Sequence, residues 1–131
     1  HETTQRACRI SHWQVSPDGA VGGEGRVLWE ETDDAAYLEV FRTKDKQFIL
    51  MSSNTKDTSE VRVIPCSGVC TGDGLAAAPT AAKAAEEQLE PKVLLARREG
   101  VEYFAEHRDG FFYVISNHER ADFAVYRLPE A

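Results

Sequence analysis

The sequence predicts an all-β protein built from repeated antiparallel sheets. Short apolar runs separated by turns that contain Gly, Asp and Pro recur along the chain. In addition, residues 37–65 align without gaps on residues 101–129, at an offset of 64 positions. Because the strands and the turns recur together, we interpret the alignment as a structural repeat. Five positions are identical: Asp45 and Asp109, Phe48 and Phe112, Ser52 and Ser116, Val61 and Val125, and Pro65 and Pro129.

Two strands are predicted before the repeat, at residues 9–15 and 26–29. Both segments contain the β-branched and aromatic residues that favour strands. The Ser-Pro-Asp-Gly sequence at 16–19 and the glycine-rich residues 22–25 predict a turn-rich connection between them. We therefore expect residues 9–29 to form half of one sheet.

Each copy of the repeat is expected to contain three strands. A charged turn, at 44–46 or 108–110, joins the first two strands of each copy, since Asp and Gly suit the backbone angles of tight turns. The second strand of each copy is apolar on both faces, which indicates that both faces are covered. The strands are expected at 37–42, 48–51 and 60–64 in the first copy, and at 101–106, 111–115 and 123–128 in the second.

The repeat is longer than the ~40–50 residues of a β-propeller blade. The excess falls in residues 67–91, which are rich in Ala and poor in large apolar residues. Strong helix formers follow Thr80, a good N-cap, so we expect an exposed, partly helical insertion. Without it the period has blade length, and residues 92–95 supply a fourth strand. The sequence thus predicts about two propeller blades of four-stranded antiparallel sheet: a half blade at 9–29, a full blade at 37–98, and three strands of the next at 101–129.

Composition excludes several classes of partner. The net charge is −7, with 22 acidic and 15 basic residues, which disfavours binding to nucleic acids or anionic membranes. No stretch approaches the ~20 apolar residues that span a bilayer. Three cysteines, an odd number, argue against a secreted disulfide scaffold and favour a cytoplasmic protein with thiols. The polar N-terminus without an initiator Met predicts that the chain begins inside a longer protein.

We expect no catalytic residue, metal site or cofactor in this chain. None of its serines lies in a Gly-x-Ser-x-Gly nucleophile elbow. Scattered histidines (His12, His107 and His118) do not by themselves define a Ser-His-Asp triad, which is a matter of geometry. Cys66 and Cys70 would need two further ligands to hold zinc.

A candidate functional surface lies where the outer strand 92–95 leads into the next inner strand. Inner strands line the central channel of a propeller. One interpretation is a salt-bridge surface between domains that gates substrate, and the other is an ordinary blade-junction turn fixed by Gly100. The aromatic residues in the strands are expected to pack between blades. The candidate residues are Arg97, Arg98, Glu99, Glu102, Tyr103 and Glu106.

Two segments resemble the N-terminal propeller of the oligopeptidase B branch of the prolyl oligopeptidase family: RVLWEETDDAAYLEVFRTKDKQFILMSSNTKDTSEVRVI and RREGVEYFAEHRDGFFYVISN. The resemblance extends over roughly residues 9–129, and the insertion at 67–91 departs from it. It implies a seven-bladed propeller that sits over an α/β-hydrolase domain and admits only short peptides to the catalytic serine. Oligopeptidase B-type members cleave after basic residues.

The resemblance implies a role as a non-catalytic propeller segment that gates peptide access, with the catalytic domain outside this chain. The expected partners are the missing blades, an α/β-hydrolase domain and short peptides, and the open blade edges predict self-association. Two alternatives stay open: a propeller-type scaffold for protein–protein interaction, and a pseudo-peptidase without hydrolytic activity. Sequence beyond residue 131 would distinguish a hydrolase domain from further blades alone.

Overall fold

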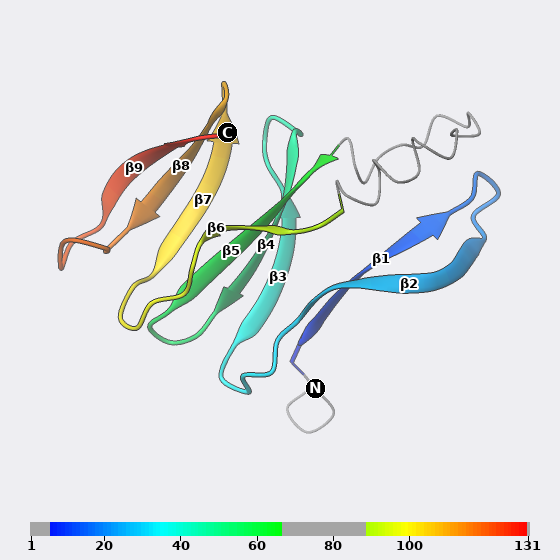
Figure 1. Cartoon of the computed structure of the whole chain (residues 1–131), viewed down its shortest axis with the longest axis horizontal. Helices are drawn as coiled ribbons and strands as arrows, with labels where there is room; N and C mark the ends of the chain where they lie inside the picture. Colours follow the sequence, from blue (N-terminus) through cyan, green and yellow to red (C-terminus); the bar gives the residue numbers. More distant parts are fainter. Residues whose placement is uncertain (1–5, 67–88, 131) are drawn as a thin grey trace.

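In the computed structural model, which describes residues 6–66 and 89–130, nine β-strands form three antiparallel sheets (Figure 1). The all-β prediction is therefore confirmed. The described residues contain no helix long and apolar enough to cross a bilayer. The first sheet contains β1 (Arg9–Val15) and β2 (Val21–Glu30), the second β3 (Tyr37–Arg42), β4 (Phe48–Asn54), β5 (Ser59–Pro65) and β6 (Lys92–Leu95), and the third β7 (Tyr103–Arg108), β8 (Phe111–Ser116) and β9 (Ala124–Pro129).

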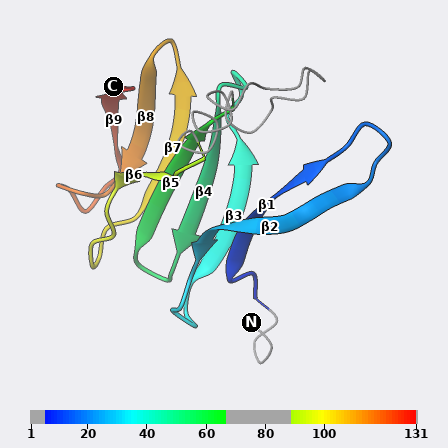
Figure 2. The same ribbon diagram turned by 45° about the vertical axis from the view of Figure 1, so that its right-hand side comes forward.

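The three sheets follow one another in chain order, and the second lies between the other two (Figures 1 and 2). One apolar cluster joins the second and third sheets, and another joins the first and second. Strands β4 and β5 are thus covered on both faces, as the continuous apolar run of β4 predicted. The buried members of the first cluster are Phe48, Leu50, Val61, Val63, Tyr103, Ala105, Phe112 and Val114, and those of the second are Trp29, Leu38, Met51 and Ile64.

The structure corrects the register of the internal repeat. The gapless alignment makes Phe48 and Phe112 equivalent, yet their rings meet in one cluster with centroids 4.9 Å apart. They therefore point toward each other from facing sheets, whereas equivalent residues of stacked repeats point the same way. The strand pairing instead makes Phe111 the equivalent of Phe48. Phe48 pairs with Pro65, and Phe111 pairs with Pro129, the proline that the alignment matches to Pro65. A slip of one residue moves every side chain of a strand to the opposite face.

Two strands begin more than one residue away from the predicted position. Strand β2 begins at Val21 rather than at residue 26, because the Ser16 N–H donates to the Ala20 carbonyl at 2.9 Å and closes the hairpin earlier. Gly25, which was predicted to lie in the connection, lies within β2 against the ring of Trp13, where a β-carbon would clash with the ring. Strand β7 begins at Tyr103 rather than at residue 101, because residues 98–101 form a turn.

The tight turn between β7 and β8 has the predicted chemistry. Asp109 and Gly110 both have positive φ values, 50° and 80°, as a two-residue type I′ hairpin turn requires. The predicted insertion at 67–91 lies largely outside the described residues, of which only 89–91 belong to it. Of these, Leu89 is buried.

Candidate functional site

Arg97, which follows β6, connects the first sheet to the second. Its Nη2 atom donates to Glu31 Oε2 at 3.0 Å and to Ser53 Oγ at 2.5 Å. Glu31 follows β2, and Ser53 lies on β4. The backbone N–H of Arg97 also donates to Glu60 Oε2 at 3.2 Å. Because the Arg97 and Glu31 side chains are only 26% and 10% exposed, the pair is better shielded from solvent than a surface salt bridge.

Glu31 is held in its ionised form by its neighbours. Burial alone would raise the pKa of this carboxyl group. Hydrogen bonds from the Ser53 hydroxyl, the Asp33 backbone N–H and the Arg97 guanidinium outweigh burial, so the pKa lies below its ordinary value of 4.5. The ionised group therefore stabilises the junction between the first and second sheets.

The lowered pKa of Glu31 predicts a loss of stability in acid. The contribution is fully present above the ordinary pKa of 4.5 and disappears as the pH falls through the lower folded-state pKa. We expect Glu31→Gln to flatten the fall in the free energy of unfolding on this acid side, as measured by urea unfolding across that range. Glu119→Gln, at an exposed loop position, is the control. Identical acid profiles for Glu31→Gln and the parent would contradict the prediction.

Tyr103 connects the third sheet to the second. Its hydroxyl accepts the Val61 backbone N–H of β5 and donates to the Leu95 carbonyl of β6, both at 2.6 Å. The β5–β6 register is irregular next to Val61, and the tyrosine hydroxyl supplies the hydrogen bonds there. Burial, offset in part by these hydrogen bonds, raises the pKa of Tyr103 to about 12. The hydroxyl therefore stays protonated and acts as a structural bridge.

Removal of this hydroxyl is expected to destabilise the chain. Tyr103→Phe leaves the Val61 N–H and the Leu95 carbonyl without this partner, at a cost of about 1–3 kcal/mol for a buried polar group. Tyr113→Phe is the matched control, because Tyr113 lies on the next strand of the same sheet and is 36% exposed. Urea unfolding of both variants measures the difference. Equal stabilities would mean that the bridge contributes nothing.

The other four candidate residues lie apart from these two contacts. Arg98 Nη1 lies 3.2 Å from the Nδ1 atom of exposed His118, and Glu99 is exposed in the turn that Gly100 completes with a φ of 74°. The backbone carbonyl of Glu102 accepts a hydrogen bond from the Ser116 hydroxyl at 3.0 Å. The Glu106 carboxylate accepts two backbone N–H groups, those of Lys44 and His107, each at 3.1 Å.

The six candidates therefore form a set of contacts along the sheet junctions rather than one pocket. Arg97, Tyr103 and Glu106 connect neighbouring sheets, and Arg98 and Glu99 are exposed. An open depression on the third sheet is lined by Glu106, Arg108, Asp109 and Tyr113. The gating of substrate by this surface stays a prediction.

Sequence reasoning missed a polar cluster around a buried histidine at the junction of the second and third sheets. His107, noted as a scattered histidine, lies between the carboxylates of Asp45 and Glu130. A Thr-x-Asp turn signal at Thr43 and Asp45 was present in the sequence. The contact between Asp45 and His107 could not be predicted from this signal, because 62 positions separate the two residues.

Comparison with known proteins gives relatives of one kind. The chain is 32% identical over 110 residues to a Xenopus laevis protein named prolyl endopeptidase-like. The matched region covers 83% of this chain and 13% of that protein. The Gallus gallus and Homo sapiens proteins of the same name are 27% and 31% identical over 106 and 91 residues. The chain spans only about an eighth of the Xenopus and Gallus proteins. No protein-family model matches the chain.

Two solved structures with a similar fold are oligopeptidases B. Oligopeptidase B from Leishmania major superposes over 97% of this chain and 15% of its own, with a TM-score of 0.70 and 16% identity. Oligopeptidase B from Trypanosoma brucei, in a closed form with covalently bound antipain, gives a TM-score of 0.68 at the same identity. In sequence and in fold, the chain resembles part of the β-propeller of the prolyl oligopeptidase family.

Proposed function

We propose that the chain is a non-catalytic propeller segment that gates peptide access in a serine oligopeptidase of the oligopeptidase B type. The peptidase would cleave short peptides after basic residues, with its catalytic serine in an α/β-hydrolase domain outside these 131 residues. The observation that carries the proposal is the face-to-face stacking of antiparallel sheets in chain order, with the fold of oligopeptidase B (Figure 1).

The contacts at the sheet junctions support a gating role because they hold neighbouring sheets together. A gate must hold its blades in fixed positions, and the Arg97 and Tyr103 contacts fix the three sheets to one another. Arg98 and Glu99 stay exposed in the turn between the second and third sheets. Such charged groups can meet a domain or a peptide without disturbing the apolar clusters. We propose that this exposed turn faces the peptide path in the full-length protein.

The gating proposal is tested with the full-length protein and peptides of two lengths. We expect Arg98→Ala combined with Glu99→Ala to change the ratio of kcat/KM between a short and a long fluorogenic peptide with Arg at the cleavage site. Arg120→Ala, at an exposed loop position in the third sheet, is the control and should leave the ratio unchanged. An unchanged ratio in the double variant would mean that this turn takes no part in gating.

The chain alone is expected to hydrolyse no peptide, because it lacks a nucleophile elbow. The measurement is a fluorogenic assay of the purified 131-residue chain beside the full-length protein, with peptides that contain Arg or Lys. Turnover that tracks the chain through repurification would contradict the expectation. Absence of turnover by the full-length protein would overturn the peptidase proposal and favour a scaffold or a pseudo-peptidase.

A further inference from the structure

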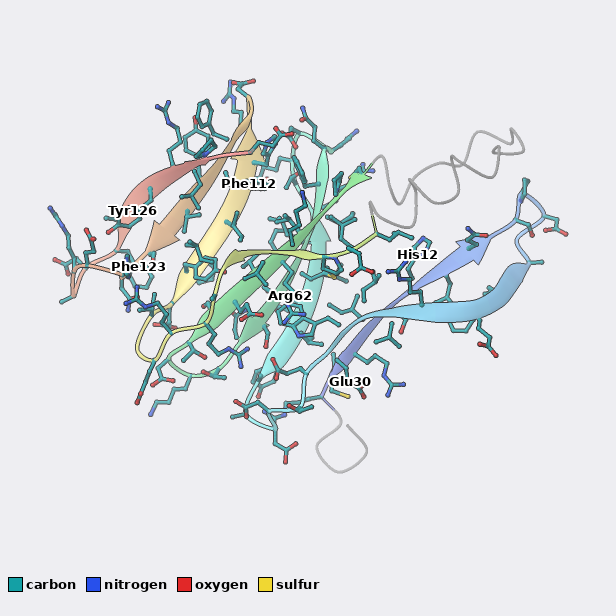
Figure 3. The ribbon with its side chains drawn as sticks, viewed as in Figure 1. His12, Glu30, Arg62, Phe112, Phe123 and Tyr126 are labelled. Carbon is teal, nitrogen blue, oxygen red and sulfur yellow. The ribbon has the colours of Figure 1, made fainter. Side chains whose placement is uncertain are left out.

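The His107 imidazole is fully buried between two carboxylates. Nδ1 lies 2.6 Å from Asp45 Oδ2, and Nε2 lies 3.1 Å from Glu130 Oε2. Asp45 comes from the β3–β4 turn of the second sheet, and Glu130 directly follows β9 of the third. The rings of Phe48 and Phe112 enclose the imidazole, with centroids 4.5 and 4.8 Å from its own, and Figure 3 labels Phe112 on the third sheet.

Hydrogen bonds donated by both ring nitrogens at once need a doubly protonated ring. A neutral imidazole has one N–H donor and one lone pair, whereas an ionised carboxylate only accepts. Both ring nitrogens of His107 face carboxylate oxygens, an arrangement that suits the imidazolium, in which both nitrogens donate. A buried charge is tolerated when it is paired and hydrogen-bonded, and carboxylates lie on both sides of this ring.

The surrounding charges favour the same state. Burial alone would raise the pKa of Asp45, but hydrogen bonds from Thr43, the Gln47 backbone N–H and His107 hold the pKa below its ordinary value of 3.8. Asp45 is therefore an anion at neutral pH. A third carboxylate, that of Glu106, accepts the His107 backbone N–H at 3.1 Å.

The cationic side chains of the β3–β4 turn do not contact the His107 ring in the described structure. Lys44 and Lys46 both have exposed side chains in that turn, and the backbone N–H of Lys44 donates to Glu106. Arg108, the next residue along β7, is exposed and lies 3.2 Å from the Asp109 carboxylate. The groups that contact His107 itself are thus anionic or aromatic.

The two carboxylates are held unequally. Asp45 is fixed in its turn, because its Oδ1 atom accepts the Thr43 hydroxyl at 2.7 Å and the Gln47 N–H at 3.1 Å. The Glu130 side chain is 43% exposed, and its contact with the ring is the longer of the two. A ring with one proton would keep it on Nδ1, toward Asp45, and would lose the contact with Glu130.

We propose that His107 is a proton-dependent latch that fastens the end of β9 to the junction between the second and third sheets. As the imidazolium it holds Asp45 and Glu130 together. Loss of the Nε2 proton releases Glu130, while the Nδ1–H contact with Asp45 persists. The inference concerns the sheet junction alone and does not depend on the proposed peptidase function.

The direct test observes the ring nitrogens by NMR in the 131-residue chain with ¹⁵N-labelled histidine, in solution or in the sedimented state. His12→Gln and His118→Gln, both outside the apolar cores, simplify the spectrum without touching the latch. At acidic pH we expect two protonated nitrogens on His107. As the pH rises, Nε2 should lose its proton and Nδ1 should keep it. A neutral ring throughout, or loss of the Nδ1 proton first, would overturn the proposal.

A second measurement follows stability and does not require a variant of the histidine. We expect the melting temperature of the parent to shift downward as the pH rises and the ring loses its Nε2 proton. Glu130→Gln should reduce that shift, because a glutamine amide can donate to the deprotonated Nε2 atom, while the contact between Nδ1 and Asp45 is unchanged. Glu119→Gln should retain it. Parallel profiles for parent and Glu130→Gln would overturn the latch, whatever their absolute stability.

Discussion

Leu50→Ala is expected to lower the free energy of unfolding by about 2–5 kcal/mol, the range for a leucine truncated in a packed core. Leu50 is 0% exposed and lies on β4, in the cluster that joins the second and third sheets. Truncation removes apolar contacts with both sheets at once and leaves a cavity between them. Because this cluster holds one sheet against the next, its loss affects the stacking itself.

Leu95→Ala is the matched control for this core. It removes the same atoms from outer strand β6 of the same sheet, where Leu95 is 37% exposed. Urea unfolding of the two variants should differ by at least about 1 kcal/mol, since surface substitutions usually change stability by about half of that. Equal losses would mean that the second and third sheets do not share a packed core.

The strands were largely predictable, because apolar runs and turn residues are local signals. The runs at β4 and β8 and the Asp109-Gly110 turn follow from short stretches of sequence. The register between the repeats was not predictable in this way. Phe111 and Phe112 both match Phe48 in type, and only the packing of one sheet on the next decides between them.

The prediction for the glycine-rich residues of β2 was wrong for a related reason. Glycine favours turns when it is considered locally, and residues 22–25 were therefore assigned to the connection between strands. The hairpin had already turned at 16–20, and Gly25 lies in β2 because the Trp13 ring of the paired strand needs the space of its missing side chain. A contact between strands thus overrode the local preference.

The junction residues were located by sequence, but their partners were not. Arg97 and Tyr103 stood out because they lie between an outer and an inner strand. The groups they contact come from distant parts of the sequence: Glu31 and Ser53 for Arg97, and Val61 for Tyr103. Contacts that span 42 to 66 positions depend on how the sheets stack, which a local pattern does not contain.

The isolated 131-residue chain is expected to self-associate. The face of the third sheet that points away from the second carries a row of apolar side chains across all three strands. Phe104, Ile115 and Val125 are neighbours in the strand pairing and are 63%, 45% and 68% exposed. Phe123, which directly precedes β9, is also exposed, and Figure 3 labels it beside the third sheet. Exposed apolar patches of this kind drive association, and open strand edges add unpaired backbone groups.

Sedimentation velocity of the isolated chain tests this expectation, with threonine substitutions to locate the surface. Phe104→Thr combined with Ile115→Thr should shift the distribution toward monomer, because it removes the apolar row and keeps strand propensity. Val15→Thr, at an exposed position on β1 of the first sheet, is the control for a general gain in polarity. If the parent chain instead sediments as a single monomer and melts cooperatively at high temperature, it closes its own core. The three sheets would then form a self-sufficient β-domain, and the outer face of the third sheet would need no further blade to cover it.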